Sequence, residues 1–342
     1  MITKVMTYVL LEVPYNSHII RIVMMVKKGK KVTVIGAGNV GATVAFILAM
    51  NGVCHHVVLR DRNTEIAKGK ALDMSQAANA ARSHTIVTAA DDAAEMEGSD
   101  IVVITAGSPR LPGMSRDDLL MINAEITKEV IQDVKKYAPD SIIIMVSNPL
   151  DVMTYVALKE SGFPKERVVG MAGILDSARM AHFIFEKIGY VSGQIRASVM
   201  GGHGDDMVPL PKFSTVAGVP LTDILSENEI SEVVERTKHG GAEIVGYLKT
   251  GSAYYAPAKS TAIMVEAMLK DTKQIHPCAV YLDGHYGHSD VVSGVPVALG
   301  ANGVEKLFEM TLNEDQKERF EKSVQSVRSM INVLKEKNFF DA

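Results

Sequence analysis

From Lys31 onward, short runs of apolar residues alternate with longer segments in which apolar residues recur every three or four positions. The short runs are typical of buried strands, and the longer segments are typical of helices that pack one face on a core. Strands are expected at 31–35, 56–61, 84–89, 100–107 and 141–149, and helices at 39–52, 63–81, 115–138 and 150–162. This alternation predicts an α/β fold built on a doubly wound parallel sheet.

The alternation stops near Val169. In the rest of the chain, the apolar pattern indicates both helices and strands without a regular order. Helices are expected at 177–189, 227–249, 257–270 and 313–337, a strand at 195–201, and a pair of strands around Asp283–Gly284. We therefore expect a first domain at 30–171 and a second, α+β domain at 172–342.

Residues 1–29 do not fit this organisation. Their apolar stretch is broken by Glu12, Pro14 and His18, and no small-residue cleavage site follows, so the segment is a poor signal peptide. We interpret it as an atypical N-terminal extension. A translation start near Met24 or Met25 is the favoured explanation, and a dispensable extension is the alternative.

The composition narrows the class of protein. Hydrophobic residues make up 47% and charged residues 22% of the 342 positions, which is ordinary for a globular protein with a core. The formal net charge is −4, so no basic surface favours nucleic acid or an anionic membrane. No apolar tract is long enough to span a membrane. Two cysteines are too few for a disulfide framework and indicate a reducing cytoplasm.

A glycine-rich turn separates the first strand from the first helix. Gly36, Gly38 and Gly41 follow the G-x-G-x-x-G spacing. The first glycine permits a tight turn, the second lets a pyrophosphate approach the backbone, and the third lets the helix pack on the strand. Asp61 ends the second strand, where a carboxylate would bind a ribose 2′-hydroxyl and repel a 2′-phosphate. The first domain is therefore predicted to be a Rossmann domain that binds NAD rather than NADP.

The second domain carries groups suited to oxidising an alcohol. Asp176 and Arg179 are three positions apart on a predicted helix, and His203 lies in the glycine-rich segment GGHGDD. Hydride transfer from a secondary alcohol needs a base for the hydroxyl proton, and histidine titrates in the right range. A carboxylate can hold the imidazole in one tautomer, and an arginine can bind a substrate carboxylate with two parallel hydrogen bonds.

Five segments taken together resemble the malate dehydrogenases of the lactate/malate dehydrogenase family. They are the glycine motif, GSPRLPGMSRDDLL, VSNPLDV, GMAGILDSAR and GGHGDDMVP, and the resemblance runs from about Lys31 to the C-terminus. It implies that His203 is the acid/base, that Asp176 is its partner and that Arg179 binds the C1 carboxylate.

The resemblance also implies roles for residues between the two domains. Asn148 would contact the substrate and the nicotinamide side, Asn123 would contact the cofactor, and the Asn148–Pro149 bond would be cis. The residues expected to bind the cofactor are Gly36, Ala37, Gly38, Asn39, Val40, Gly41, Asp61, Asn123, Val146, Ser147 and Asn148.

Two arginines lie six positions apart in the loop segment GSPRLPGMSR. The resemblance implies that Arg116 polarises the substrate carbonyl as the loop closes, and that Arg110 pairs with a second substrate carboxylate. Lactate dehydrogenases commonly have a glutamine at the position of Arg110, so this residue favours a dicarboxylate. The expected reaction is the reversible NAD-dependent oxidation of (S)-malate to oxaloacetate, a step of the tricarboxylic acid cycle, in a homodimer or homotetramer.

Two other functions remain open from the sequence. A lactate or other 2-hydroxymonocarboxylate dehydrogenase would need no Arg110, and a nucleotide-sensing protein without turnover would need no catalytic set. No metal is expected, although His276, Cys278, His285 and His288 are close in the sequence. Alternate residues of a strand face opposite sides, so these four need not converge.

Overall fold

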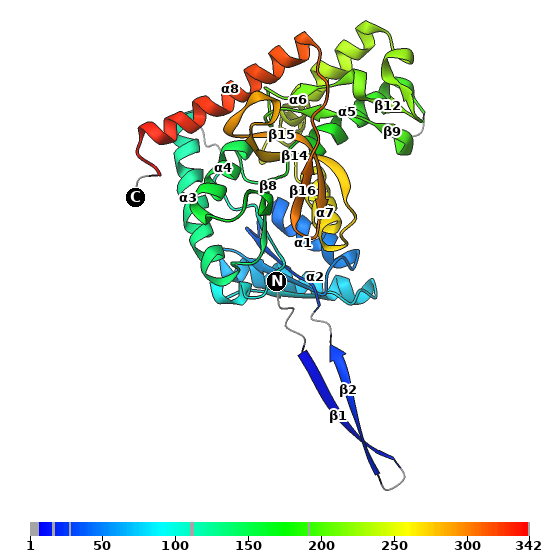
Figure 1. Cartoon of the computed structure of the whole chain (residues 1–342), viewed down its shortest axis with the longest axis vertical. Coiled ribbons are helices and arrows are strands. Elements are labelled where there is room, and N and C mark those ends of the chain that lie inside the picture. The colour runs from blue at the N-terminus through cyan, green and yellow to red at the C-terminus, as the bar shows by residue number, and fades with distance from the viewer. Residues whose placement is uncertain (1–6, 16–17, 27–28, 110–112, 191, 341–342) are drawn as a thin grey trace.

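The computed structural model describes residues 7–15, 18–26, 29–109, 113–190 and 192–340 (Figure 1). A sheet of nine strands, in the order β16-β15-β14-β8-β7-β6-β3-β4-β5, forms the centre of the molecule. The parallel strands are β3 (Lys31–Ile35), β4 (His56–Arg60), β5 (Ile86–Ala89), β6 (Ile101–Ile104), β7 (Ile142–Met145) and β8 (Val168–Gly170). The doubly wound parallel sheet predicted from the sequence is therefore confirmed.

Three antiparallel strands from late in the chain extend this sheet beyond β8. They are β14 (Gln274–Asp283), β15 (Ser289–Gly300) and β16 (Gly303–Leu307). The strand pair around Asp283–Gly284 was expected, but its addition to the parallel sheet was not. One sheet therefore runs through both halves of the chain.

Helices follow the parallel strands and cover the sheet. In the first half, α1 packs against α2, and α3 packs against α4. Late helices join each pair, because α7 packs on α1 and α8 packs on α3 and α4. The helices are α1 (Asn39–Met50), α2 (Thr64–Ala80), α3 (Arg116–Tyr137), α4 (Leu150–Ser161), α5 (Gly173–Ile188), α6 (Glu227–Leu248), α7 (Tyr255–Leu269) and α8 (Glu314–Glu336).

The sequence sets several helix ends locally. Ser115 and Asp118 form a reciprocal capping box at the start of α3, where two backbone N–H groups would otherwise lack partners. Helix α4 ends at Gly162, which adopts the left-handed conformation that glycine tolerates without strain. These ends were predicted within one or two residues. Helix α5 starts four residues earlier than predicted, at Gly173.

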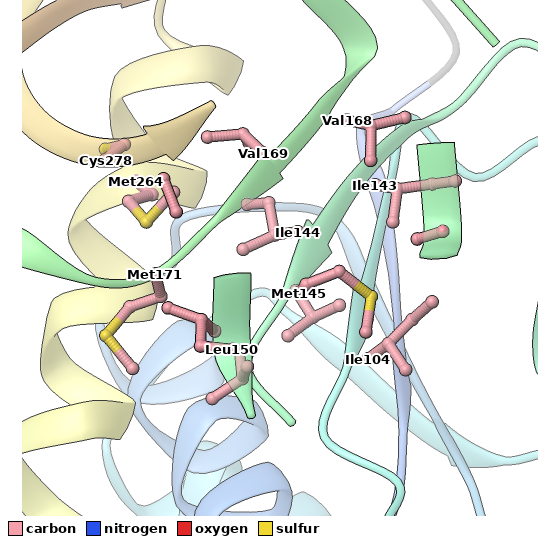
Figure 2. Close-up of a cluster of buried hydrophobic side chains, with 14 of the residues drawn as sticks. Ile104, Ile143, Ile144, Met145, Leu150, Val168, Val169, Met171, Met264 and Cys278 are labelled. Carbon is pink, nitrogen blue, oxygen red and sulfur yellow. The ribbon is translucent and has the colours of Figure 1, made fainter. Parts of the chain in front are cut away.

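The main core lies between the sheet and its helices. Figure 2 shows its centre, where Ile143, Ile144 and Met145 of β7 lie among side chains of β6, β8 and α4. Cys278 of β14 and Met264 of α7 belong to the same cluster, so the late strands and helices share the core of the parallel sheet. This shared core fixes the position of the second half relative to the first.

A second, smaller core lies under α5 and α6, around Met180, Ile184 and Leu221. The predicted strand at 195–201 is two short strands in the structure. Short strands in this region are β9 (Ile195–Arg196), β10 (Val199–Met200), β11 (Val208–Pro209), β12 (Thr215–Val216) and β13 (Val219–Pro220). Short 3₁₀ helices are η1 (Ala93–Met96), η2 (Lys165–Arg167), η3 (Ser192–Gln194), η4 (Pro211–Phe213), η5 (Leu221–Asp223) and η6 (His285–Gly287).

The N-terminal extension contains an antiparallel hairpin that was not predicted. Its strands are β1 (Thr7–Tyr15) and β2 (His18–Val26), and they form a separate two-stranded sheet. The hairpin extends away from the rest of the molecule (Figure 1). Among the described residues, no helix has the length and apolar character needed to cross a membrane.

Candidate active site

A cleft of about 590 Å³ opens at the carboxyl ends of β3, β4 and β6. In this sheet, β3 pairs with β4 on one side and with β6 on the other. The crossovers that follow β3 and β6 therefore lead in opposite directions across the sheet. Ligands of open α/β sheets bind at such a point. The cleft is lined by Ile35, Gly36, Gly38, Arg60, Asp61, Arg62, Thr105, Ala106, Gly107, Ser108, Pro109, Ile122, Ile126, Glu129, Val130 and Asp133.

The three glycines of the turn have different surroundings. A Cβ on Gly41 would lie 1.9 Å from the carbonyl oxygen of Gly36, and Gly36 itself has φ +103°, which favours glycine. A Cβ on Gly38 would meet no protein atom within 4 Å. Gly36 and Gly41 are therefore required by the protein's own packing, whereas the space beside Gly38 is open. Gly38 also precedes α1, which begins without a side-chain cap.

Asp61 lies beside this turn with its carboxylate fixed. One oxygen accepts the backbone N–H of Ala37 at 2.7 Å, and the other accepts that of Asn63 at 2.9 Å. The neighbouring Arg60 pairs with Asp133 at 2.7 Å, and both residues line the same cleft. Arg62 also lines the cleft.

Asn123 of α3 connects the loops that contain Ser108 and Asn148. Its side-chain amide donates to the carbonyl oxygens of Asn148 at 2.7 Å and Ser108 at 3.2 Å, and its oxygen accepts the N–H of Ser108 at 2.7 Å. The Asn148–Pro149 bond is cis, which confirms the expectation. The side chain of Asn148 is exposed. Ser147 donates to the carbonyl oxygen of Ala106 at 2.6 Å and joins the same two loops.

Asp176 and Arg179 of α5 meet His203, which lies 27 positions beyond Asp176. The Nδ1 of His203 donates to one oxygen of Asp176 at 2.8 Å, and Arg179 donates to the other at 3.2 Å. The side chain of Asp176 is 2% exposed, against 13% for His203 and 14% for Arg179. Because Nδ1 is occupied, Nε2 is left as the nitrogen that can exchange a proton with a ligand.

The charges around His203 favour its protonated form. Burial by itself lowers the pKa of His203, but the charge and hydrogen bond of Asp176 and the charge of Asp151 outweigh burial. The pKa of His203 is therefore raised above its ordinary value. Among the described residues, the buried Nε of Arg179 has no hydrogen-bond partner. The guanidinium of Arg179 as a whole is a planar donor group of the kind that binds carboxylates.

Asp151 of α4 also contacts the histidine and was not among the predicted site residues. Its carboxylate accepts the backbone N–H of His203 at 2.7 Å, and the residue is 3% exposed. Burial raises the pKa of this carboxyl to about 6, although the His203 N–H opposes the shift. The sequence signal is an acid at the start of an otherwise apolar helix, which is weak because acids are common in first turns.

Of the two loop arginines, the structure describes Arg116. Arg116 is the first residue of α3 and lies 3.9 Å from Asp205, two positions after His203. Both side chains are at least 80% exposed, so this ion pair is weak. The loop nevertheless places Arg116 beside the histidine turn. Arg110 lies outside the described residues.

The residues singled out as a superficial metal motif occupy β14 and the turn after it. Cys278 is fully buried in the main core, whereas His276 and His285 are only partly buried. His288 lies 3.5 Å from Glu321 of α8. Within the part of the chain that the structure describes, no group of three or more His, Cys, Asp or Glu residues is placed to hold a metal ion.

Comparisons with known proteins agree with this architecture. Residues 30–170 match the NAD binding domain of lactate/malate dehydrogenase, and residues 174–338 match its alpha/beta C-terminal domain. A malate dehydrogenase of Sulfurimonas denitrificans is 72% identical, and one of Nitratiruptor sp. is 61% identical. Both matches span 314 residues, which is 92% of this chain and 98% of each relative.

Solved structures show the same similarity. The malate dehydrogenase of Picrophilus torridus is 42% identical with a TM-score of 0.89, over 92% of this chain and all of that one. A lactate dehydrogenase of Cryptosporidium parvum, complexed with lactic acid and nicotinamide adenine dinucleotide, is 38% identical with a TM-score of 0.87. That match covers 91% of this chain and 99% of the other. This chain belongs to the lactate/malate dehydrogenase family.

Proposed function

We propose that this protein is an NAD-dependent malate dehydrogenase, which interconverts (S)-malate and oxaloacetate in the tricarboxylic acid cycle. The observation that carries the proposal is the buried contact of His203 with Asp176, which also holds Arg179. This contact joins a proton-exchanging group to a carboxylate-binding group in a chain with an NAD-binding domain. The identities of 72% and 61% to malate dehydrogenases support the choice of substrate.

The cleft residues fit a dinucleotide. The open space beside Gly38 and the uncapped N-terminus of α1 suit a pyrophosphate, which helix N–H groups bind well. The fixed carboxylate of Asp61 suits the ribose hydroxyls. The residues proposed to hold the cofactor are Gly36, Ala37, Gly38, Asn39, Val40, Gly41, Asp61, Asn123, Val146, Ser147 and Asn148. In this set Asn123 acts indirectly: its side-chain amide holds the backbone of Ser108 and Asn148 in place.

His203 acts as the acid/base in this proposal. A bound NAD⁺ would supply the hydride acceptor for C2 of malate. The hydroxyl proton of malate passes to Nε2 of neutral His203, so the C2–O bond becomes the carbonyl of oxaloacetate. In the reverse direction, imidazolium returns this proton to the carbonyl oxygen. Asp176 keeps the Nδ1 proton in place in both directions and stabilises the imidazolium.

The substrate carboxylates and carbonyl are assigned to three arginines. Arg179 binds the C1 carboxylate through its planar N–H groups, and its position beside His203 is set by their shared contact with Asp176. Arg116 polarises the C2 carbonyl once it leaves Asp205, with Asn148 as a further contact. Arg110 binds the C4 carboxylate. Leaving Arg110 desolvated against a monocarboxylate would cost about 3–5 kcal/mol, or about 10²–10⁴ in selectivity.

We further propose that residues 30–171 and 172–342 are the two functional domains. The proposed assembly of the enzyme is a homodimer or a homotetramer. Its two cysteines, Cys54 and Cys278, are buried free thiols, which supports a reducing cytoplasmic location.

A steady-state comparison of oxaloacetate with pyruvate tests the proposal. Wild type should prefer oxaloacetate strongly. Arg110→Gln should lower kcat/KM for oxaloacetate by about 10²-fold or more and raise it for pyruvate, because the second carboxylate loses its partner. Arg116→Gln is the matched control and should depress both substrates. An unchanged ratio in Arg110→Gln, or a wild-type preference for pyruvate, would favour a 2-hydroxymonocarboxylate dehydrogenase instead.

A further inference from the structure

The backbone of the histidine turn is held at three consecutive positions by three distant elements. The N–H of Gly201 donates to the carbonyl oxygen of Gly294 in β15 at 2.8 Å. The N–H of Gly202 donates to the hydroxyl of Ser323 in α8 at 2.7 Å. The N–H of His203 donates to the carboxylate of Asp151 in α4 at 2.7 Å. The position of the histidine is therefore set by contacts outside its own loop.

Asp151 is the unusual member of these three acceptors. Ser323 shows that a neutral side chain can accept a buried N–H in this turn, whereas a buried carboxylate carries a large desolvation cost. The residue is 3% exposed, and among the described residues its Oδ1 is buried without a hydrogen-bond partner. The backbone N–H groups of His203 and of Asp151 itself favour the charged form, but burial outweighs them and the pKa of this carboxyl stays raised. A nearby positive charge would offset the cost of burying the Asp151 carboxylate, and protonated His203 can supply one.

Packing leaves little freedom in the contact. A Cβ on Gly202 would lie 3.2 Å from Val327 of α8, 3.3 Å from Ser323 and 3.5 Å from the Oδ2 of Asp151. The turn thus lies directly between α4 and α8. The carboxylate of Asp151 is held against the His203 backbone in this enclosed space.

We propose that Asp151 is a positioning residue for His203: its buried carboxylate holds the histidine backbone and adds a second negative charge beside the imidazole. The proposal rests on the proposed function only in taking His203 as the acid/base. It assigns Asp176 and Asp151 different tasks. Asp176 binds the ring and fixes its tautomer, whereas Asp151 binds the main chain and acts on the ring through its charge.

The charged groups that face His203 come from three directions. Asp176 and Arg179 lie on α5, and Asp151 lies on α4. Helix α8 contributes the uncharged Ser323, while Arg116 and Asp205 form an exposed ion pair at the edge of the turn. The negative charge of Asp151 favours the imidazolium form, so removing that charge must lower the pKa of His203.

The first test is an NMR titration of the His203 ring in wild type and in Asp151→Asn. Asparagine keeps the volume and an oxygen that can accept the backbone N–H, but it removes the charge. The His203 pKa should fall by about one unit in the variant. Ser323→Ala removes a neighbouring acceptor without a charge, and Asp206→Asn removes an exposed charge from the same loop. Neither should shift the His203 pKa by more than a few tenths. Equal pKa values in wild type and Asp151→Asn would overturn the proposal.

The second test is the pH dependence of turnover in both directions. Oxaloacetate reduction needs imidazolium, and malate oxidation needs neutral imidazole. In Asp151→Asn, the alkaline fall of kcat/KM for oxaloacetate should move to lower pH by about one unit. The rise of kcat/KM for malate should move in the same direction. A uniform loss of activity with both profiles unshifted would indicate a merely structural Asp151 and would contradict the proposal.

The two experiments separate this inference from the function on which it rests. If wild type fails to reduce oxaloacetate, the proposed function fails, and the ring titration still decides the role of Asp151. If Asp151→Asn does not fold, the carboxyl of Asp151 can be titrated in wild type by carbon NMR. A carboxyl that titrates near 6, together with a second inflection of the His203 ring, supports the contact. A carboxyl that titrates near 4, with no effect on the ring, would overturn it.

Discussion

Two glycine-rich turns carry candidate site residues in this protein, and they use their backbone in opposite ways. The turn at 36–41 follows β3 and leaves open space beside Gly38, at the start of a helix whose first N–H groups have no partners within the helix. The turn at 201–204 gives the N–H groups of Gly201, Gly202 and His203 to Gly294, Ser323 and Asp151. The first turn can bind a ligand through its backbone, whereas the second is held rigidly and presents a side chain.

The difference explains why glycine is needed at each place. In the first turn, one glycine leaves open space beside the backbone, which is proposed to receive a phosphate, and two permit close packing. In the second turn, Gly201 has φ +83° and lies against Val208 and Ser323, so its backbone fits into a space already enclosed by protein. A glycine-rich segment therefore indicates a close approach, but not whether a ligand or the protein makes that approach.

The largest expected effect comes from removing the side chain that the second turn presents. His203→Asn should keep the fold and NADH binding, because its backbone contacts are unchanged, but it should lower kcat by at least about 10². Stopped-flow measurement of oxaloacetate reduction checks the rate, and NADH fluorescence checks binding. Near-normal turnover would remove His203 from the mechanism.

Two alanine substitutions in the first turn should have different effects. In Gly41→Ala the new Cβ would overlap the Gly36 carbonyl, so the free energy of unfolding should fall by at least about 1–3 kcal/mol. In Gly38→Ala the new Cβ meets no protein atom, so unfolding of the apoprotein should be nearly unchanged while NADH binding weakens.

Thermal unfolding and NADH titration of both variants provide the check. The pair is informative because the same substitution is made three positions apart. Equal loss of stability in the two variants would show that Gly38 also serves the protein's own packing, and the contrast with the second turn would then fail.

The support of the second turn can be weakened without touching its side chains. In Gly294→Ala the new Cβ would lie 2.5 Å from the carbonyl oxygen of Gly201, so the turn must shift. We expect kcat to fall about tenfold with NADH affinity unchanged, since a displaced acid/base group reacts poorly from an imperfect geometry. Val295→Ala, a core truncation next to this position, is the control for general destabilisation. A fall in both kcat and NADH affinity would point to wider disruption.

A smaller change should sharpen the role of Asp61 beside the first turn. Asp61→Ser should weaken NADH binding about tenfold and reduce discrimination against NADPH, because a carboxylate that would repel a 2′-phosphate is removed. Arg62→Ser, the matched control, removes a positive charge from the same cleft and should not help NADPH. Dissociation constants for both dinucleotides give the answer. A wild-type preference for NADPH would contradict the assignment.

Much of the first half could be predicted from local patterns. The parallel strands, their helices and the glycine turn are each encoded within a short stretch, by the spacing of apolar residues or of glycines. Asp61 was predicted as a site residue because it ends a strand in the same unit. The positions of Asn123 and Ser147 were taken from family resemblance. Their hydrogen bonds to Ser108 and Ala106 had no local signal, because they join loops that follow different strands.

The second half was less predictable because its contacts span longer separations. The amphipathic helices were found, but β16 and the addition of β14 and β15 to the parallel sheet were not. An apolar strand pattern shows that a strand is buried, and it does not show which neighbour the strand pairs with. The extension of the sheet depends on β14 meeting β8 at Ala279 and Gly170, which are 109 positions apart.

The sequence by itself determined the residue types that are proposed to carry the chemistry: a glycine turn with Asp61, an Asp176–Arg179 pair on one helix face, and a histidine among glycines. Tertiary structure decided which of them meet and what holds them. His203 meets Asp176 across 27 positions and Asp151 across 52, because α4, α5 and α8 pack around one turn. Local spacing cannot encode such contacts, since they depend on the shared core that fixes these helices relative to one another. For the same reason Asp151, a plain acid in the sequence, becomes a buried charge beside the histidine only in the folded protein.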